Sequence, residues 1–206
     1  MMATMEPEAR DLLSPLLVQD EQAAARLHAR LAAAAAADGI LDVAYRTADT
    51  PLGTLLLAAT EQGLVRVAYP SQGHDAALEQ LAELVSPRIL NAPGRLDAVA
   101  RQLDEYFSRR RRAFDVPVDL RLSKGFRCSV LTHLLQIPYG ATESYAQVAA
   151  ATGRPRAVRA AGTACATNPV PIVVPCHRVV RSDGSPGGYA GGPDAKRSLL
   201  TLEAAW

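Results

Sequence analysis

The stretch PVPIVVPCHRVV, residues 169–180, is the most informative part of this 206-residue chain. Its centre, from Ile172 to Val174, is β-branched and has no polar interruption, which is typical of a short strand in a protein core. Pro175 has no backbone N–H to donate to a neighbouring strand, so the strand should end there. We therefore expect Cys176 at a strand end, where its side chain faces a cleft.

Two roles are open to Cys176. Most cysteines are buried, inert packing residues. A reactive thiol attacks as the thiolate, and because its ordinary pKa is roughly 8.5, it requires a base or a cation close by. His177 and Arg178 follow directly in the sequence. This neighbourhood favours a nucleophile over a packing residue.

Composition restricts the class of protein. A hydrophobic content of 49% is enough for one large domain or two small ones with real cores. The three cysteines, Cys128, Cys165 and Cys176, contain no CxxC pair, which argues against a disulfide framework and a four-ligand zinc site. No run reaches the roughly 18 apolar residues of a membrane span, and acidic residues occupy the place of a signal peptide's basic head. We expect a soluble, cytoplasmic protein without a metal site.

Charge is distributed unevenly along the chain, although the formal net charge is only +1. Residues 1–120 hold 12 Lys+Arg and 17 Asp+Glu, a balance of −5, whereas residues 121–206 hold 10 and 4, a balance of +6. A basic half beside an acidic half suggests that a polyanion meets the second half.

The N-terminal part is expected to hold a helix and a small sheet. Residues 6–37 are rich in strong helix formers, and Gly39 provides a stop, which predicts a long helical extension. Short β-prone runs at 42–47, 54–60 and 64–69 are separated by turn residues and predict an antiparallel meander.

Two amphipathic helices are predicted to cover that sheet, one carrying Ala77 to Val85 and one carrying Leu96 to Phe107. The four arginines at 109–112 follow the second helix; a solvated helix end is favoured there over a phosphate site. An extended connector comes next, and we place a domain boundary in it. The expected divisions are 1–40, a helical extension, 41–115, an α/β domain, and 116–206, a mainly helical domain.

A helix-turn-helix is predicted in the second half. Ser144 to Gln147 forms a capping-box signature that opens a short helix, Gly153 breaks it, and Pro155 is suited to open a second helix that runs to Ala166.

The second helix of this pair is unusual, because apart from its arginines its side chains are small and offer little for reading bases in a major groove. Small residues allow close approach to another helix or to a narrow minor groove. Arg159, a long cation amid small neighbours, favours the nucleic-acid interpretation slightly. Cys165 on the same helix is most simply a packing residue.

Together these residues resemble the O6-alkylguanine-DNA alkyltransferases, also called methylated-DNA–protein-cysteine methyltransferases. The resemblance covers residues 42–206. It rests on Pro-Cys-His-Arg-Val at 175–179, Asn-Pro-Val-Pro at 168–171, Ser144-Tyr145, Arg159, Gly-Tyr-Ala-Gly-Gly at 188–192, Lys196-Arg197 and Leu-Leu-Thr-Leu-Glu at 199–203. Ordered matches of that density are highly specific.

The resemblance implies an α/β plus mainly α fold, with a ribonuclease H-like N-terminal domain and a winged-helix-like C-terminal domain that holds the helix-turn-helix. It implies a monomer that binds double-stranded DNA containing O6-alkylguanine through the minor groove. The damaged base is flipped out, since its target atom is shielded in the stack. The alkyl group is then transferred irreversibly to the cysteine, once per protein and without a cofactor.

Carried onto this chain, the resemblance also implies roles for single residues. Cys176 is the acceptor, His177 its base through a water, and Glu203 the residue that orients His177, while Lys196 supports the thiolate and Tyr145 assists flipping. The implied DNA contacts are Arg159, which fills the vacated stack, Tyr145, Ala157, Gly162, Thr163 and Ser182. The implied base pocket is Tyr189, Ala190, Gly191, Pro171 and Val179, and Asn168 braces the hinge before the thiol.

Other interpretations remain at this point. Glu203 is otherwise expected to be solvated, and residues 188–192 to form a flexible surface loop. Ala141 occupies a position that is often polar in relatives, and the absence of a zinc-binding cysteine cluster argues against a methylation-triggered transcription activator. The alternative functions are a non-catalytic protein that binds alkylated DNA and recruits other repair factors, and a Cys-His hydrolase, which requires an oxyanion hole. The range of alkyl groups, and repair of O4-alkylthymine, are left open.

Overall fold

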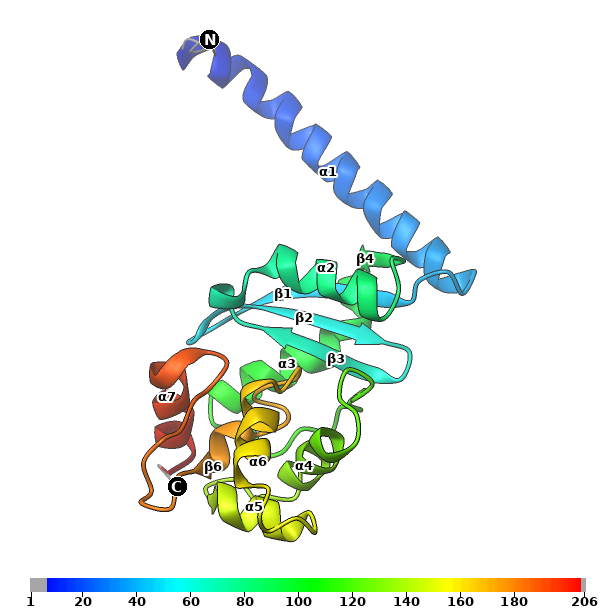
Figure 1. Cartoon of the computed structure of the whole chain (residues 1–206). Helices are drawn as coiled ribbons and strands as arrows, with labels where there is room; N and C mark the ends of the chain where they lie inside the picture. The colour runs from blue at the N-terminus through cyan, green and yellow to red at the C-terminus, as the bar shows by residue number, and fades with distance from the viewer. Residues whose placement is uncertain (1–6, 205–206) are drawn as a thin grey trace, which may run out of the picture. The chain divides into compact units, whose positions relative to one another are not determined.

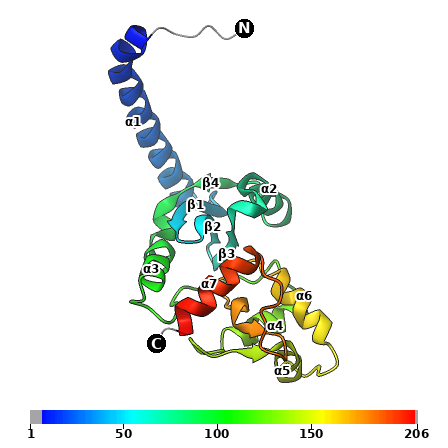
Figure 2. The same cartoon turned by 90° about the vertical axis from the view of Figure 1, so that its left-hand side faces the viewer.

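The computed structural model describes residues 7–204, and contacts divide the chain into two units, the first of which ends at Leu41. The first unit consists of helix α1, Pro7–Ala37, drawn as one continuous helix in Figures 1 and 2. Just beyond it, Gly39 adopts a left-handed φ of +67°, which suits a glycine stop. The helix predicted over 6–37 is confirmed except at its first residue, which lies outside the described residues.

Four strands of the second unit form one mixed sheet in the order β3-β2-β1-β4. They are β1 (Val43–Thr50), β2 (Gly53–Thr60), β3 (Gly63–Ala68) and β4 (Ile89–Asn91). The antiparallel meander β1-β2-β3 is confirmed. β4 pairs parallel with β1 and was not predicted, because three residues carry too little pattern to show a strand.

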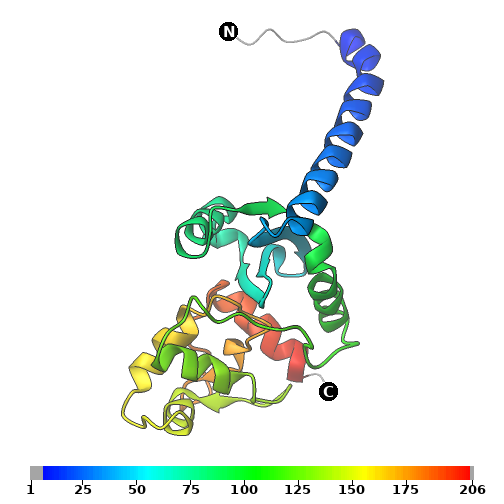
Figure 3. The ribbon, with the colours of Figure 1, turned by 90° about the vertical axis from the view of Figure 1, so that its right-hand side faces the viewer.

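β2 is buried on both faces after its first two residues. Successive side chains of a strand point to opposite faces. Leu55 and Leu57 belong to the cluster that includes Leu103 of α3 (Asp97–Phe107), whereas Leu56 packs with Ala77 of α2 (His74–Leu84). The two predicted covering helices are therefore confirmed, one on each face of the sheet, as Figure 3 shows.

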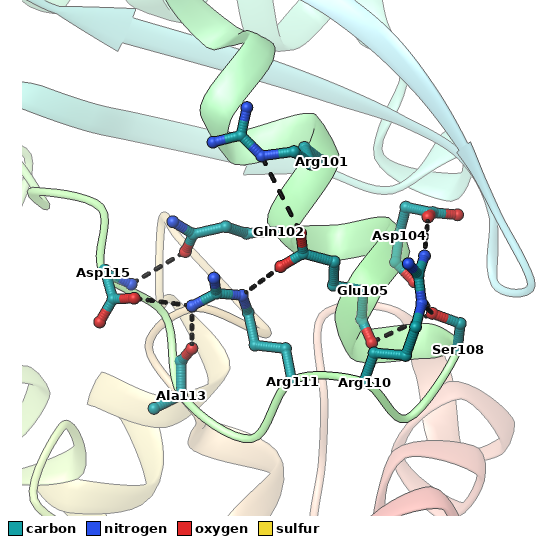
Figure 4. A network of polar contacts seen from close by, with 9 residues as sticks. All are labelled: Arg101, Gln102, Asp104, Glu105, Ser108, Arg110, Arg111, Ala113 and Asp115. Atoms are coloured by element: carbon teal, nitrogen blue, oxygen red, sulfur yellow. Dashed lines mark hydrogen bonds and ion pairs between the residues drawn. The ribbon is translucent and has the colours of Figure 1, made fainter.

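The arginines that follow α3 are largely engaged within the protein. The ion pairs are Arg110–Asp104 at 2.8 Å, and Arg111–Glu105 and Arg111–Asp115, both at 2.7 Å. Figure 4 shows how they tie the end of α3 to the segment that leaves it. These contacts support a structural use of Arg110 and Arg111 in place of a phosphate site.

The chain after residue 120 is mainly helical. Its elements are α4 (Phe126–Leu134), β5 (Glu143–Ser144), α5 (Tyr145–Ala151), α6 (Val158–Ala166), the 3-10 helix η3 (Cys176–Arg178), β6 (Val179–Val180) and α7 (Gly192–Ala204). β5 and β6 form a small parallel ribbon. The second unit thus holds a mixed sheet in its N-terminal part and a mainly helical C-terminal part.

The outer edge of β3 is contacted by the connector and by the turn that precedes the thiol. Leu64 forms a parallel bridge with Val118 of the connector. The amide of Val67 donates to the carbonyl of Pro169 at 2.8 Å, so the turn before the thiol is hydrogen-bonded to the sheet.

The strand predicted over Ile172 to Val174 is wrong. The segment is a tight turn in which the amide of Val174 donates to the carbonyl of Val170 at 2.9 Å. Ile172 has a φ of +75°, a left-handed conformation that is strained for a β-branched residue. A buried turn needs apolar side chains as much as a buried strand does, so the apolar run alone did not distinguish them.

The second helix of the helix-turn-helix begins later than predicted. α6 starts at Val158, because residues from Arg154 form a turn in which the amide of Ala157 donates to the carbonyl of Arg154 at 2.8 Å. Gly153 precedes this turn with a φ of +76°. Pro155 therefore lies in the turn and not at the first position of the helix.

Candidate active site

Cys176 is the first residue of η3 and is only 1% exposed, so the cleft-facing position expected from the sequence is not observed. Its Sγ accepts a hydrogen bond from Asn168 Nδ2 at 3.1 Å. The same amide group donates to the carbonyl of Val174 at 2.8 Å, and Asn168 Oδ1 accepts from the amide of Val170 at 3.0 Å. One side chain thus holds both the turn and the thiol.

Two groups oppose the effect of burial on the thiol. Burial raises the pKa of Cys176 to about 11, while the hydrogen bond from Asn168 and the charge of Lys196 act to lower it. Lys196, on α7, is fully buried and donates from Nζ to the carbonyl of Val179 at 2.6 Å. Burial lowers the pKa of Lys196, and a charge on Cys176 would raise it. Lys196 and Asn168 are therefore the groups that favour the thiolate.

Glu203, also on α7, is an ionised carboxylate that is only 2% exposed, so it is not the solvated residue of the alternative interpretation. Burial raises its pKa, but the hydrogen bonds from His177 and Arg178 outweigh burial and bring the pKa to about 2. Arg178 donates from Nε to Oε2 and from Nη2 to Oε1, both at 2.9 Å. The Tyr106 hydroxyl donates to Oε1 at 2.7 Å and the Gly140 amide to Oε2 at 3.2 Å. The carboxylate is held by four residues.

The bond between His177 and Glu203 fixes which nitrogen of the imidazole is basic. His177 Nε2 lies 2.9 Å from Glu203 Oε1, and because an ionised carboxylate only accepts, Nε2 carries the hydrogen. Burial lowers the pKa of His177 more than Glu203 raises it, so the ring is neutral near pH 7. Nδ1 is then the free acceptor, buried and without a hydrogen-bond partner in the part of the chain that the structure describes. Such an imidazole, oriented by a carboxylate, suits removal of a proton.

Two tyrosines lie beside this imidazole. The hydroxyls of Tyr189 and Tyr69 are 3.0 Å apart, and the Tyr189 ring meets the His177 ring edge to face with centroids 6.4 Å apart. Tyr69 follows β3 in the N-terminal part of the unit. A Cβ on Gly191 would lie 2.7 Å from the Tyr69 ring, so only glycine allows the loop this close approach.

Tyr145 lies at the start of α5, where the predicted capping box is confirmed. Ser144 Oγ accepts from the Gln147 amide at 3.2 Å, and Gln147 Oε1 accepts from the Ser144 amide at 2.7 Å. The Tyr145 ring is partly buried, with Lys196 Nζ 5.7 Å from its centroid. Burial, followed by the charges of the two buried cysteines, raises the pKa of Tyr145 to about 12. Its hydroxyl is therefore protonated at neutral pH.

Apart from Tyr145, the residues predicted to touch DNA are exposed or partly exposed and lie outside the buried cluster. Arg159 and Thr163 are exposed on α6, whose opposite face buries Ala161, Ala164 and Cys165. The remaining predicted contacts are Ser182, which is exposed, and Ala157 and Gly162, which are partly exposed. α6 thus presents a surface of small residues with one long cation.

The predicted site residues form one inner group and one outer group. The inner group is Cys176, His177, Glu203, Lys196, Asn168, Pro171 and Val179, all buried. Tyr145, Tyr189, Ala190 and Gly191 are partly exposed around it. The sequence did not single out Tyr69, or Tyr106, which is 97 residues from Glu203 along the chain. Arg178 was taken as a cation for the thiol, but its guanidinium instead binds Glu203 and the carbonyl of Ile137.

Two kinds of feature are absent from residues 7–204. No group of three or more His, Cys, Asp or Glu side chains there is arranged to hold a metal ion. No helix in the same range is both long and apolar enough to cross a membrane.

Comparison with known proteins gives a consistent result over most of the chain. A family model described as the ribonuclease-like domain of 6-O-methylguanine DNA methyltransferase matches residues 43–120, and one described as the DNA-binding domain of the same protein matches residues 125–205. The methylated-DNA–protein-cysteine methyltransferase of Mycobacterium tuberculosis is 41% identical over 159 residues, 77% of this chain and 91% of that protein. The constitutive enzyme of that name from Bacillus subtilis is 38% identical over 160 residues, 77% of this chain and 94% of that protein.

Solved structures agree with these sequence relatives. The crystal structure of Mycobacterium tuberculosis O6-methylguanine methyltransferase superposes with a TM-score of 0.70 at 39% identity and covers 79% of this chain and 93% of that one. The structure of the Mycobacterium tuberculosis protein in complex with DNA gives a TM-score of 0.67 at 38% identity, with the same coverage.

Proposed function

Because the chain belongs to the 6-O-methylguanine DNA methyltransferase family, we propose that it repairs DNA by moving the alkyl group of O6-alkylguanine to Cys176. The observation that carries the proposal is the buried imidazole of His177, whose Nε2 donates to Glu203 and whose Nδ1 has no hydrogen-bond partner among residues 7–204. His177 directly follows Cys176 in the chain, whereas neither Cys128 nor Cys165 is next to a histidine.

The transfer is a single displacement. His177 Nδ1 takes the thiol proton of Cys176 through a water, and the Sγ then attacks the alkyl carbon. A sulfur–carbon bond forms as the bond between that carbon and guanine O6 breaks, and the electron pair passes to the guanine. The product thioether has no basic leaving group, so the protein acts once and needs no cofactor.

Neighbouring groups stabilise the charges of this reaction. Lys196 and Asn168 support the thiolate, in line with the direction in which each moves the pKa of Cys176. Tyr145 has a raised pKa and therefore offers a neutral O–H donor to the leaving guanine. In this proposal Arg178 and Tyr106 are positioning residues, because they act on Glu203 and not on the reacting atoms.

The alkylated base has to reach a thiol that is 1% exposed, so we infer that it is flipped out of the duplex into a pocket that opens beside η3. Tyr189, Ala190 and Gly191 form one wall of this pocket, and Pro171 and Val179 form the other. Glycines in this loop let the main chain approach a planar base.

DNA binding is assigned to the helix-turn-helix of α5 and α6. The small residues of α6 fit a narrow minor groove, with Arg159 entering the stack that the flipped base leaves. Ala157, Gly162, Thr163 and Ser182 lie on the surrounding surface, and double-stranded DNA is the expected partner of a monomer. In the same proposal residues 41–115 form a ribonuclease H-like domain and residues 116–206 a winged-helix-like one.

Intact mass spectrometry tests the proposal. The full chain is mixed with a duplex that contains one O6-methylguanine, and the expected product is a protein heavier by one methyl group, with the added mass in the peptide that contains Cys176. An adduct on Cys165, or methyl release over many turnovers, would overturn it.

A further inference from the structure

A groove on the second unit contains two arginines whose side chains have no partner among the described residues. The groove is a cavity of about 530 Å³ between β3, α2, the start of α4 and the segment that follows α6. Its polar lining is Arg66, Gln72, Gln80, Glu83, Arg127, Thr167 and Asn168. Within residues 7–204, neither guanidinium forms an ion pair or a hydrogen bond. Both are therefore available to a ligand.

Arg66 is the residue that makes the groove unusual. It extends from β3, is partly buried, and its Nε is buried without a hydrogen-bond partner. Burial lowers the pKa of Arg66, yet a guanidinium remains charged at neutral pH. A partly buried cation without a partner is costly, and an anion that accepts its hydrogens would relieve that cost.

A second cavity extends the positive lining toward α6. It has a volume of about 510 Å³, shares Leu122 and Arg127 with the first, and adds Lys124. Its α6 side is made of Ala160, Thr163 and Ala164, which are too small to fill it. Three cations therefore line the two neighbouring cavities, against the single carboxylate of Glu83.

We propose that this groove, which we call the arginine groove and define by Arg66 and Arg127, is a binding site for a phosphate group. A guanidinium binds phosphate through two parallel hydrogen bonds, and the glutamines of the wall supply further donors. The phosphate belongs either to a free phosphate ester or to a nucleic-acid backbone. Asn168, which donates to Cys176 Sγ, also lies in the wall of this groove, so the groove adjoins the segment that holds the thiol. Phosphate binding there goes beyond the alkyl-transfer function proposed above.

The first test measures binding of inorganic phosphate by the full chain, using calorimetry and thermal unfolding at constant ionic strength with chloride as the reference anion. Phosphate should raise the melting temperature of the wild type, and Arg66→Gln should weaken phosphate binding about tenfold or more, since it removes charge-assisted hydrogen bonds. Arg127→Gln, on the exposed side, should weaken it as well.

The matched control is Arg101→Gln, which removes an exposed arginine of α3 whose ion pair with Glu105 is long, at 3.9 Å. This variant should keep the full response to phosphate. In chloride alone, Arg66→Gln should be at least as stable as the wild type, because it removes an unpaired, partly buried charge. An equal phosphate response in the wild type and in both groove variants would overturn the proposal.

A second arm distinguishes the two sources of phosphate, using unmodified duplex DNA at several salt concentrations. If the ligand is a backbone phosphate, Arg66→Gln should reduce the slope of log K against log salt by about 1. If the ligand is a free phosphate ester, that slope should stay unchanged while the response to inorganic phosphate is lost.

Methyl uptake at Cys176 is recorded for the same variants. A groove variant with normal methyl uptake and no response to phosphate would support phosphate binding in the arginine groove. A wild type without methyl uptake would contradict the proposed repair function and leave the groove proposal unaffected.

Discussion

Cys165 on α6 and Cys176 on η3 are buried to almost the same degree, with 2% and 1% of each residue exposed. Their surroundings differ. Burial raises the pKa of Cys165 to about 12 and that of Cys176 to about 11. The lower value belongs to the thiol that accepts a hydrogen bond from Asn168. Burial raises the pKa of both thiols and the charge of Lys196 acts to lower both, so what distinguishes Cys176 is the hydrogen bond from Asn168 and the histidine that follows it in the chain.

The strongest test of this comparison removes each sulfur in turn. Cys176→Ala should abolish methyl uptake from O6-methylguanine DNA and leave DNA binding largely intact, because the thiol lies apart from the exposed face of α6. Cys165→Ala should keep one methyl group per protein, as measured by intact mass. Methylation of the Cys176→Ala protein at the wild-type level would contradict the assignment.

Glu203→Gln tests whether the carboxylate of Glu203 is needed both for stability and for the reaction at Cys176. It leaves Arg178 buried without its counter-charge, so the free energy of unfolding should fall by about 3–5 kcal/mol, with loss of methyl uptake. Glu61→Gln, at an exposed position, should change the free energy of unfolding by less than about 0.5 kcal/mol. Urea unfolding monitored by circular dichroism measures both.

The same carboxylate predicts how stability depends on pH. The pKa of Glu203 is lowered from 4.5 to about 2 on folding, so its contribution is fully present above pH 4.5 and is lost as the pH falls toward 2. Wild type and Glu203→Gln should therefore converge in stability across that window. Parallel curves from pH 6 to pH 2 would contradict this linkage.

Asn168→Ala removes the donor that distinguishes the two thiols. Its loss leaves the carbonyl of Val174 and the amide of Val170 without these bonds, and the variant should unfold more easily by about 1–3 kcal/mol. Methyl transfer should slow, because the thiolate of Cys176 loses a hydrogen bond. The transfer rate in a single-turnover assay, measured from pH 6 to 10, should shift toward higher pH relative to the wild type; an unshifted profile would show that Asn168 acts on the turn alone.

Gly187→Ala probes Tyr145, which lies within reach of the charges of both cysteines. A Cβ on Gly187 would lie 2.2 Å from the Tyr145 hydroxyl, so the ring has to move, at a cost of about 1 kcal/mol. Gly188→Ala is the matched control, because its added Cβ meets nothing within 4 Å. Methyl transfer should slow only in the first variant; equal rates would show that the position of Tyr145 is not critical.

The parts of the fold that the sequence predicted well depend on local patterns. The capping box at Ser144 and Gln147 needs only four consecutive residues. The meander of β1 to β3 follows from short β-prone runs that are separated by turn residues. The motif at 175–179 likewise places His177 next to Cys176 in the chain by covalent connection alone.

What the sequence did not show depends on tertiary contacts. Tyr106 reaches Glu203 from α3, and Tyr69 reaches Tyr189 from the end of β3; both are ordinary core aromatics in their own segments. The left-handed φ of Ile172 is imposed against the preference of that residue, so no local rule leads to it. The sequence shows that Arg178 is charged, but only the folded structure shows that its guanidinium binds Glu203 and not the thiol.

The hydrogen bond from Val67 to Pro169 has a consequence for solubility. β3 is an outer strand, and a bare outer strand is a template on which further chains assemble into aggregates. In this protein the edge of β3 is already paired, with Val118 at Leu64 and with Pro169 at Val67. A change that separates the segment before Cys176 from β3 would therefore disturb the active site and, at the same time, expose a strand edge on which chains can aggregate.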